Sequence, residues 1–227
     1  MLGFIPFWVE PVARLMATEG LKLTGKIAAV SVSASAVFGV VLGTLLTIRW
    51  WPIRSAIRLY IEIWRGLPII VTIFLMYFTL PTFHVVIEAW LAGAVALSLW
   101  GSAQVAEATR GAVESIPREQ HEAAAALGFG WVGRHAFVIV PQALRRLLPP
   151  FVSLLVNVIQ NTTLVALIGV GEILATGQRQ TERLQYPAPV GVGDSHALAI
   201  YGGVLVMFFV ISFPLTRLAA FLERRLV

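Results

Sequence analysis

Cysteine is absent from this 227-residue chain, and charged residues make up only 13% of it. Without cysteine, the chain can form neither disulfide bonds nor thiolate metal sites, and it has no thiol nucleophile. Its four histidines are too dispersed in the sequence to suggest a zinc motif. These absences exclude disulfide-stapled small domains and cysteine-based enzymes.

The motifs of common active sites are missing as well: there is no GxSxG elbow, no HExxH and no plausibly placed pair of carboxylates. Residues Gly20–Ile27 come near the phosphate-binding pattern GxxxxGK[ST]. However, Ile27 stands where a magnesium-binding hydroxyl belongs, and no strand is predicted before it. We therefore expect no enzymatic activity, no ATP hydrolysis, and no metal or cofactor bound by this chain.

Apolar residues are abundant instead, at 58% of the chain, which is too much for a soluble domain of ordinary makeup. The formal net charge is +5, but the basic residues lie in short groups between apolar runs. Because no basic, aromatic-rich element collects them, we do not expect nucleic-acid binding. The expected surroundings of this chain are a lipid bilayer.

Five apolar runs predict an all-α integral membrane protein with five transmembrane helices in a single domain, residues 1–227. The expected spans are residues 27–48, 57–80, 89–106, 147–171 and 197–216. The first has no charge over its length and would measure about 33 Å as a helix, enough to cross a bilayer core. Residues 172–196 are expected to form a polar connection.

Small residues recur every four positions in the first span: Ser31, Ser35, Gly39, Gly43 and Thr47. Such a ridge permits close approach of another helix. We favour packing within the same bundle over a subunit interface.

The residues before the first span do not resemble a cleavable signal, because Pro6, Glu10 and Pro11 interrupt the apolar run and no basic region precedes it. We expect Met1–Gly20 to be retained as an interfacial segment.

Basic residues predict the orientation, because cytoplasmic loops carry an excess of Lys and Arg. Of the 17 Lys and Arg residues, those on one side of the predicted spans are Arg49, Arg54, Arg58, Arg65, Arg110, Arg118, Arg134, Arg145, Arg146, Arg217, Arg224 and Arg225. Only Arg14, Lys22, Lys26, Arg179 and Arg183 fall on the other. The N-terminus is therefore expected outside, with the C-terminus and the loop between spans three and four in the cytoplasm.

This loop belongs to the longest polar interruption of the sequence, Pro117–Pro150. A short helix is predicted over Pro117–Leu127, because proline suits a first turn and four alanines favour a helix. Gly128 is expected to end it.

Two large rings, Phe129 and Trp131, follow that helix. Gly130 and Gly133 are expected to allow tight turns that hold both rings in a segment facing water. Exposed rings beside a short helix suggest a docking site for another protein.

From Glu122 the chain reads Glu-Ala-Ala, three residues, Gly128, nine residues, then Val138, one residue, Val140 and Pro141. This order resembles the EAA loop of ABC-importer permeases, which have Ile and Leu where this chain has Val138 and Val140. The stretches YIEIWRGLP, PQALRRLLPP and IQNTTLVALIGVGE resemble the polar-amino-acid branch of that family, which carries histidine, glutamine, glutamate or arginine. The resemblance runs from about residue 21 to the C-terminus.

The resemblance implies a multi-pass subunit of the bacterial inner membrane that moves a polar amino acid into the cytoplasm. It also implies several partners: a second permease subunit, identical or paralogous; two ATPase subunits, which bind ATP and magnesium; and an extracytoplasmic solute-binding protein. A helix in the EAA loop, residues 117–141, would couple the chain to an ATPase. The implied coupling residues are Glu122, Ala123, Ala124, Gly128, Phe129 and Trp131.

Polar side chains at membrane depth are the candidates for the substrate path, because they are unfavourable there unless paired or used. They are Gln104, Glu107, Gln160, Asn161, Thr162 and Thr163. Gln104 and Glu107 share a helix face, although Glu107 could simply pair with Arg110. The run from Gln160 to Thr163 suits a helix broken at mid-membrane, or else hydrogen bonding between helices.

A different class of function is an ATP-independent channel or secondary transporter. In that case the basic loop would be only a cytoplasmic anchor.

Overall fold

The computed structural model describes residues 6–48, 50–186 and 194–226, and these form helices and contain no strand. Their contacts define two compact units. Of the described residues, the first unit comprises 6–30, 70–97, 158–186 and 194–213, and the second comprises 31–48, 50–69, 98–157 and 214–226. Four long helices pass from one unit into the other, so each unit contains only a part of them.

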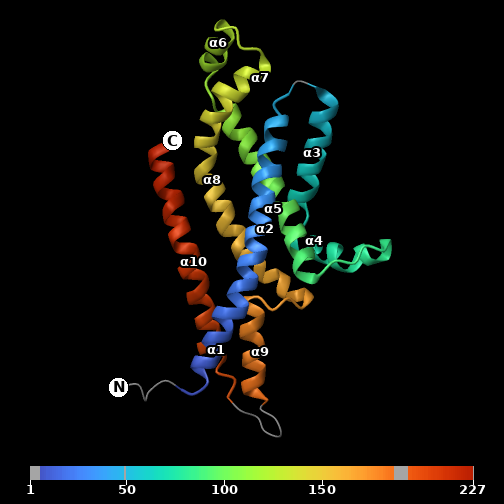
Figure 1. Ribbon diagram of the computed structural model, residues 1–227, viewed down its shortest axis with the longest axis vertical. Coiled ribbons are helices and arrows are strands. Elements are labelled where there is room, and N and C mark those ends of the chain that lie inside the picture. Colours follow the sequence, from blue (N-terminus) through green and yellow to red (C-terminus); the bar gives the residue numbers. More distant parts are fainter. Residues whose placement is uncertain (1–5, 49, 187–193, 227) are drawn as a thin grey trace. The chain divides into compact units, whose positions relative to one another are not determined.

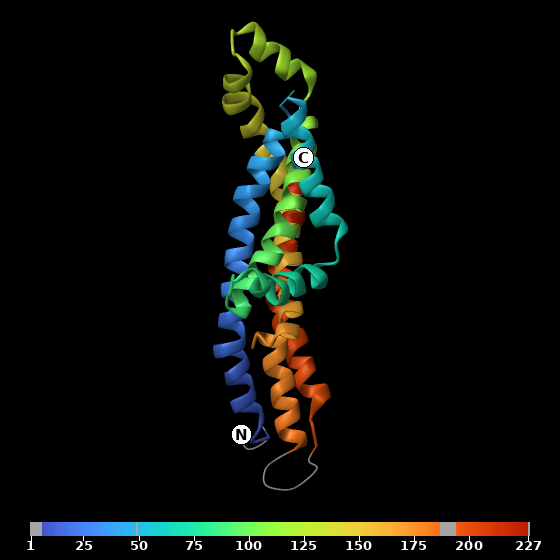
Figure 2. The same cartoon turned by 90° about the vertical axis from the view of Figure 1, so that its right-hand side faces the viewer.

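In the first unit, three helical segments surround an apolar core. Helix α1 (Val9–Leu15) continues through a π-helical turn, η1 (Met16–Gly20), into α2 (Leu21–Leu45), and it packs against α9 (Ile173–Gln185) and the start of α10 (Ala197–Leu226). The buried core side chains are Val12, Met16, Ile173, Ile200 and Val204. Figures 1 and 2 both show α9 beside α1.

The first unit also contains a series of short segments. Helix α4 (Ile69–Phe74) is followed by the π-helical η2 (Leu75–Thr79) and the 3-10 helix η3 (Leu80–Phe83). A second 3-10 helix, η5 (Thr162–Ile168), lies against the first turns of α5 (Ala89–Glu114), where a Cβ on Gly93 would stand 2.4 Å from Val165.

In the second unit, the last part of α2 packs with α3 (Trp51–Gly66) and α5, and α5 packs with α8 (Val140–Asn161). One core holds Leu46, Ile57, Ile61, Ala103 and Ala106, and the other holds Ala112, Val113, Ile116, Ile139, Ala143 and Leu147. Between α5 and α8 the chain forms α6 (Arg118–Ala126), α7 (Trp131–Arg134) and the π-helical η4 (His135–Ile139). Figure 2 shows these segments beyond the ends of α2 and α5.

The small-residue ridge of α2 packs against α5 within the bundle, as the sequence predicts. Ser35 donates from its hydroxyl to the carbonyl of Ser98 at 3.5 Å. A Cβ on Gly43 would stand 2.4 Å from the carbonyl oxygen of Ala106, so only glycine fits there without movement.

Within the described residues, four helical segments are long and apolar enough to cross a membrane: Val9–Leu45, Ala89–Glu114, Trp131–Ile168 and Ala197–Leu226. A fifth candidate is the interrupted pair Trp51–Gly66 and Ile69–Phe83. The all-helical membrane architecture is therefore confirmed. The count of five holds only when the interrupted pair is one span.

The expected first span, residues 27–48, is the C-terminal part of a much longer helical segment. Residues 9–20 continue directly into α2 rather than forming a separate interfacial segment, and residues 1–5 lie outside the described part. Lys26 directly precedes the expected first span. In the structure, Lys26 remains inside the helix and its ammonium lies 3.4 Å from the centroid of the Trp90 ring, a cation–π contact.

The expected second span, residues 57–80, is wrong as a single helix. Leu67 is extended, with ψ of 137°, because the residue before a proline is disfavoured in the α conformation, and the chain turns sharply between α3 and α4. Pro68 therefore divides the span into two helical pieces.

The polar connection expected over residues 172–196 contains a helix of its own. The carboxylate of Glu172 accepts from the N–H of Ala175 at 2.8 Å and so caps α9. One face of α9 is buried, which includes Ile173, Thr176 and Thr181. Residues 187–193 lie outside the described part of the chain.

The remaining spans follow the prediction more closely. The expected span 89–106 lies within the longer α5, and 197–216 lies within the longer α10. The span 147–171 is represented by most of α8 and by η5, which ends at Ile168.

Candidate functional site

The EAA loop begins with α6, which ends in a sharp turn. Gly128 has φ of +83°, in the left-handed region that suits glycine. Its N–H donates to the carbonyl of Ala125 at 2.9 Å, and the N–H of Phe129 donates to that of Ala124 at 3.1 Å. These two bonds form the Schellman motif of helix ends. The predicted helix end at Gly128 is therefore confirmed.

The body of α6 is fixed on one side and open on the other. Ala124 is buried, and Gln142 of α8 donates to the side chain of Gln120 at 3.2 Å. Glu122 and Ala123 are exposed. An acidic side chain and a small one are therefore presented to the surroundings on a supported helix.

The exposed apolar surface of the loop differs from the expected one. Trp131 is only partly exposed, because its ring stacks on His135 with centroids 4.1 Å apart. Phe129 is 37% exposed, whereas Leu127, Val132 and Phe137 are between 72% and 78% exposed. We call Leu127, Phe129, Val132 and Phe137 the apolar loop surface.

The expected turn at Gly133 is wrong, because Gly133 lies inside α7, whereas Gly130 is the extended residue before α7. The helical region of residues 131–139 puts Val132 and Phe137 outside and Trp131 against His135. Sequence reasoning missed Val132 and Phe137 because it expected irregular backbone here.

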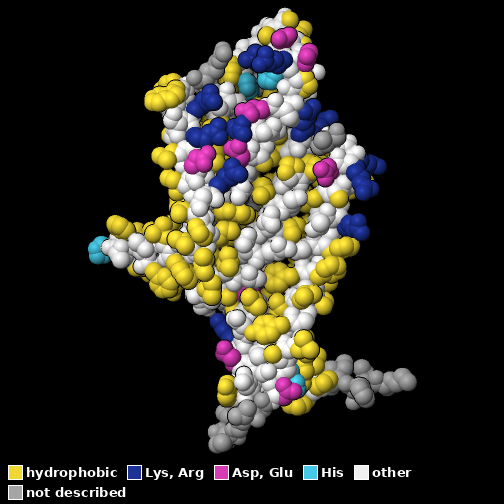
Figure 3. All heavy atoms as spheres, turned by 180° about the vertical axis from the view of Figure 1, so that it is seen from behind, with side chains coloured by type: hydrophobic (Ala, Val, Ile, Leu, Met, Phe, Trp, Pro, Cys, Tyr) yellow, Lys and Arg dark blue, Asp and Glu magenta, His cyan; other side chains and the backbone are white. Residues whose placement is uncertain are grey.

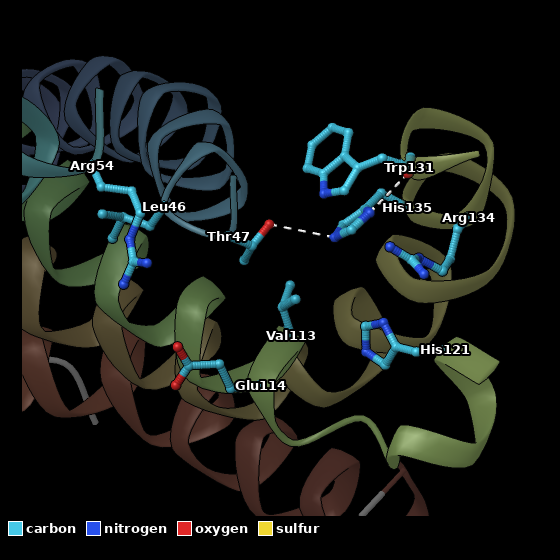
Figure 4. A pocket seen from close by; sticks show the side chains of 9 residues that line it. All are labelled: Leu46, Thr47, Arg54, Val113, Glu114, His121, Trp131, Arg134 and His135. Carbon is cyan, nitrogen blue, oxygen red and sulfur yellow. Dashed lines mark hydrogen bonds between the residues drawn. The ribbon is translucent and has the colours of Figure 1, made fainter. Parts of the chain in front are cut away.

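A cavity of about 340 Å³ lies in the second unit behind the EAA loop (Figure 4). It is lined by Leu46, Thr47, Arg54, Val113, Glu114, His121, Trp131, Arg134 and His135. These residues come from the turn after α2 and from α3, α5, α6, α7 and η4. The cavity therefore brings the EAA loop together with elements that precede it in the sequence.

His135 connects the EAA loop to the end of α2. Its Nδ1 lies 2.9 Å from the carbonyl oxygen of Trp131, and its Nε2 lies 3.4 Å from the hydroxyl of Thr47 (Figure 4). Because a carbonyl only accepts, Nδ1 carries a proton. The buried ring thus joins α7 to the connection between α2 and α3.

The electrostatic environment of the cavity is positive. The pKa of His121 is lowered from its usual value, first by burial and then by the charges of Arg134 and His135. Figure 4 shows the Arg134 side chain extending toward the space between these two rings.

Charged side chains of both signs also gather on one face of the second unit, in the upper part of Figure 3. On α5, Arg110 donates to Glu107 at 2.5 Å and also to Glu114. A second guanidinium, that of Arg58, lies 3.8 Å from Glu107. Of the two roles left open for Glu107, the structure contains the pair with Arg110. Gln104 lies one turn away from Glu107 and is partly buried.

The other group of substrate-path candidates lies in the first unit, where α8 gives way to η5. Thr162 is fully buried and donates to the carbonyl of Ile159 at 2.7 Å, whereas Gln160 is exposed. Thr163 donates to the carbonyl of Gln160 at 2.8 Å, and Asn161 is partly buried. At these residues the α-helix changes into a 3-10 helix. The four side chains differ in exposure and therefore do not all meet one neighbour.

Among the described residues, no three His, Asp or Glu side chains gather in a way that could hold a metal ion. The candidate functional features among the described residues are the EAA loop, the cavity behind it, and the two polar groups on α5 and at the end of α8.

A family model described as binding-protein-dependent transport system inner membrane component matches residues 35–227. The chain is 34% identical over 210 residues to the glutamine transport system permease protein GlnP of Escherichia coli K12, covering 92% of this chain and 91% of that protein. It is 29% identical to a probable glutamine ABC transporter permease protein of Bacillus subtilis, also named GlnP, covering 91% and 92%.

The structure is also similar to that of a solved amino acid ABC transporter crystallised with histidines. The two chains superpose with a TM-score of 0.78 at 26% identity, over 97% of this chain and 99% of that one. Both kinds of comparison therefore extend over nearly the whole sequence.

Proposed function

The chain belongs to the family of binding-protein-dependent transport system inner membrane components, and we propose that it is the permease subunit of an importer for a polar amino acid. Glutamine is the first substrate to test, because two relatives of the chain are named glutamine permeases. The chain itself is a multi-pass inner-membrane permease and not an enzyme. Relatives of this kind act as membrane components of ABC transporters, which favours an importer over an ATP-independent channel or secondary transporter.

The observation that carries the proposal is the geometry of the EAA loop. Its helix is anchored through Ala124, presents Glu122 outward, and ends in a Schellman turn at Gly128. The apolar loop surface lies in the following turns. A small rigid helix with an adjacent apolar surface suits insertion into a groove of another protein. We assign that groove to an ATPase subunit, with Glu122, Ala123, Phe129 and Trp131 in or beside the contact.

In the assembly we propose, two permease subunits, identical or paralogous, are joined by two ATPase subunits and a solute-binding protein. The ATPase subunits bind ATP and magnesium, and their closure moves the permeases between two orientations through the EAA loops. Gln104, Glu107 and Gln160–Thr163 are the proposed contacts along the substrate path. The EAA loop and the C-terminus then lie in the cytoplasm.

The decisive experiment is purification of the chain from its own membranes, followed by mass spectrometry of the intact complex and reconstitution into vesicles. We expect ATPase subunits to co-purify. Uptake of a polar amino acid should require ATP on the side of the vesicle membrane that corresponds to the cytoplasm. It should also require the solute-binding protein on the opposite side. Ion-driven uptake by the chain alone would overturn the proposal.

A further inference from the structure

The cavity behind the EAA loop has an excess of positive charge. Four of its lining side chains are basic: Arg54, His121, Arg134 and His135. The one carboxylate that lines it, Glu114, already accepts a hydrogen bond from Arg110. Among the described residues, neither Arg54 nor Arg134 forms an ion pair. The other two acidic residues of the loop, Glu119 and Glu122, do not line the cavity.

Arg134 carries the clearest sign of a missing acceptor. Its Nε is buried and has no hydrogen-bond partner among the described residues. Buried donors are nearly always paired, and an unpaired one needs an explanation. Because a guanidinium presents several N–H groups in a fixed plane, it is well suited to phosphate oxygens. The pKa of the nearby His121 is lowered first by burial, and the charges of Arg134 and His135 lower it further.

The cavity lies where candidate membrane spans end. It is bordered by the residues after α2, by the first turn of α3 and by the last turn of α5. Trp50 and Trp51, just before and at the start of α3, are 61% and 75% exposed. Exposed tryptophans next to a span are typical of the lipid headgroup level. Basic pockets between membrane helices at this level bind acidic headgroups.

We propose that this cavity binds a phosphate-bearing anion through Arg54, Arg134 and His121. The volume of about 340 Å³ corresponds to several water molecules and leaves room for a phosphate group. Such an anion has two sources, the headgroup of an acidic lipid and free phosphate. Since Arg54 belongs to α3 and the other two residues belong to the EAA loop, the bound anion ties the loop to the helix bundle. Occupancy of the cavity therefore stabilises the loop in the position that faces a partner.

The test uses the importer purified with its ATPase subunits in nanodiscs of neutral phosphatidylcholine. One series adds phosphatidylglycerol to the nanodiscs. Another adds inorganic phosphate to the buffer, and its reference contains chloride at the same ionic strength. The melting temperature of the complex is measured against the amount of each anion. We expect it to rise with one or both, and Arg134→Gln should raise the concentration needed by roughly tenfold. Arg145→Gln is the matched control, because Arg145 is an exposed arginine of α8 that does not line the cavity.

The outcomes separate the sources. A response to phosphatidylglycerol alone identifies the lipid headgroup, and a response to phosphate in neutral nanodiscs identifies free phosphate. If Arg134→Gln does not assemble, Arg54→Gln tests the same cavity from α3. The proposal is overturned if neither anion stabilises the complex, or if the Arg134 and Arg145 variants respond alike. It is also overturned if Arg134→Gln only weakens attachment of the ATPase, which would indicate an acidic side chain of the partner.

Discussion

Gly39 of α2 and Val105 of α5 are in such close contact that a Cβ on the glycine would stand 2.4 Å from the Cβ of Val105. The carbonyl oxygen of Ser102 would lie 2.9 Å from the same atom. Both distances are far shorter than a van der Waals contact. The absence of a side chain at residue 39 therefore sets the separation of the two helices in the second unit.

Gly39→Ala is expected to destabilise the chain by about 1–3 kcal/mol, because the helices must move apart to admit one methyl group. Thermal unfolding of the purified complex measures the effect. Gly25→Ala is the matched control on the same helix, since a Cβ there would meet nothing within 4 Å. Adding Val105→Ala to Gly39→Ala should recover part of the loss. Equal melting temperatures for Gly39→Ala and Gly25→Ala would contradict the close packing.

The ridge on α2 was predictable because small residues at a spacing of four define one helix face. The identity of its partner was not, because periodicity does not say which helix lies opposite. The same limit applies at Thr47, the last residue of the ridge, which meets His135 of the EAA loop instead of α5. That contact depends on the turn after α2, where the helical period no longer applies.

Gly128→Ala is expected to reduce coupling between ATP hydrolysis and uptake, because a side chain disfavours φ of +83° by about 1–2 kcal/mol. Gly130→Ser should be tolerated, since Gly130 has φ of −65° and serine suits the residue before a helix. Glu122→Lys should have a similar effect to Gly128→Ala by reversing an exposed charge. ATPase activity and uptake are measured on the same vesicles. Normal uptake in both the Gly128 and Glu122 variants, with the ATPase bound, would remove the coupling role of α6.

A reporter fused after the last residue is expected to read cytoplasmic, because most of the basic residues gather on that side of the predicted spans. A second reporter, inserted near Pro189 in the part that the structure does not describe, should read extracytoplasmic. Fusions that are enzymatically active on only one side of the membrane provide the measurement. The reverse pattern would remove the orientation and, with it, the assignment of the EAA loop to an ATPase.

Proline and capping explain where the sequence prediction of the spans was wrong. The hydropathy of residues 57–80 suggested one helix, although Pro68 restricts Leu67 to an extended conformation. At α9 the cap is a glutamate, Glu172, which is not among the residues preferred before a helix. The cavity behind the EAA loop could not be predicted at all, because its residues are distant in sequence and only the fold brings them together.

Asn161→Ala and Thr162→Val distinguish the two roles left open for the polar group at the end of α8. If these residues contact the solute, the variants should change the apparent affinity for the amino acid while the complex assembles normally. Thr162 is fully buried, and its hydroxyl donates a hydrogen bond to the carbonyl oxygen of Ile159. Thr162→Val alone is therefore expected to remove this hydrogen bond from the carbonyl of Ile159. Uptake kinetics and melting temperature are measured on the same preparations. A loss of stability with unchanged kinetics would remove these residues from the substrate path.

The stability of the EAA loop is expected to depend on pH through His121. Burial, followed by the charges of Arg134 and His135, holds the pKa of this imidazole below its ordinary value of about 6.5. The folded loop therefore binds a proton less readily than the unfolded chain. The contribution of the neutral ring is complete above the unfolded pKa and is lost as the pH falls below that value toward the folded pKa.

Melting temperatures of the complex should therefore change little from about pH 8 to pH 7 and decrease as the pH falls below about 6.5, and His121→Gln should make that decrease smaller. His84→Asn is the control, because His84 is an exposed histidine of the first unit with positive φ, which asparagine also adopts. A phosphate-bearing anion in the cavity would offset the positive charge around His121, so adding the stabilising anion should reduce the pH dependence of the wild type but not of His121→Gln. If His121→Gln and the wild type lose the same stability on acidification, the positive environment of the cavity does not act on His121 in the way the geometry indicates.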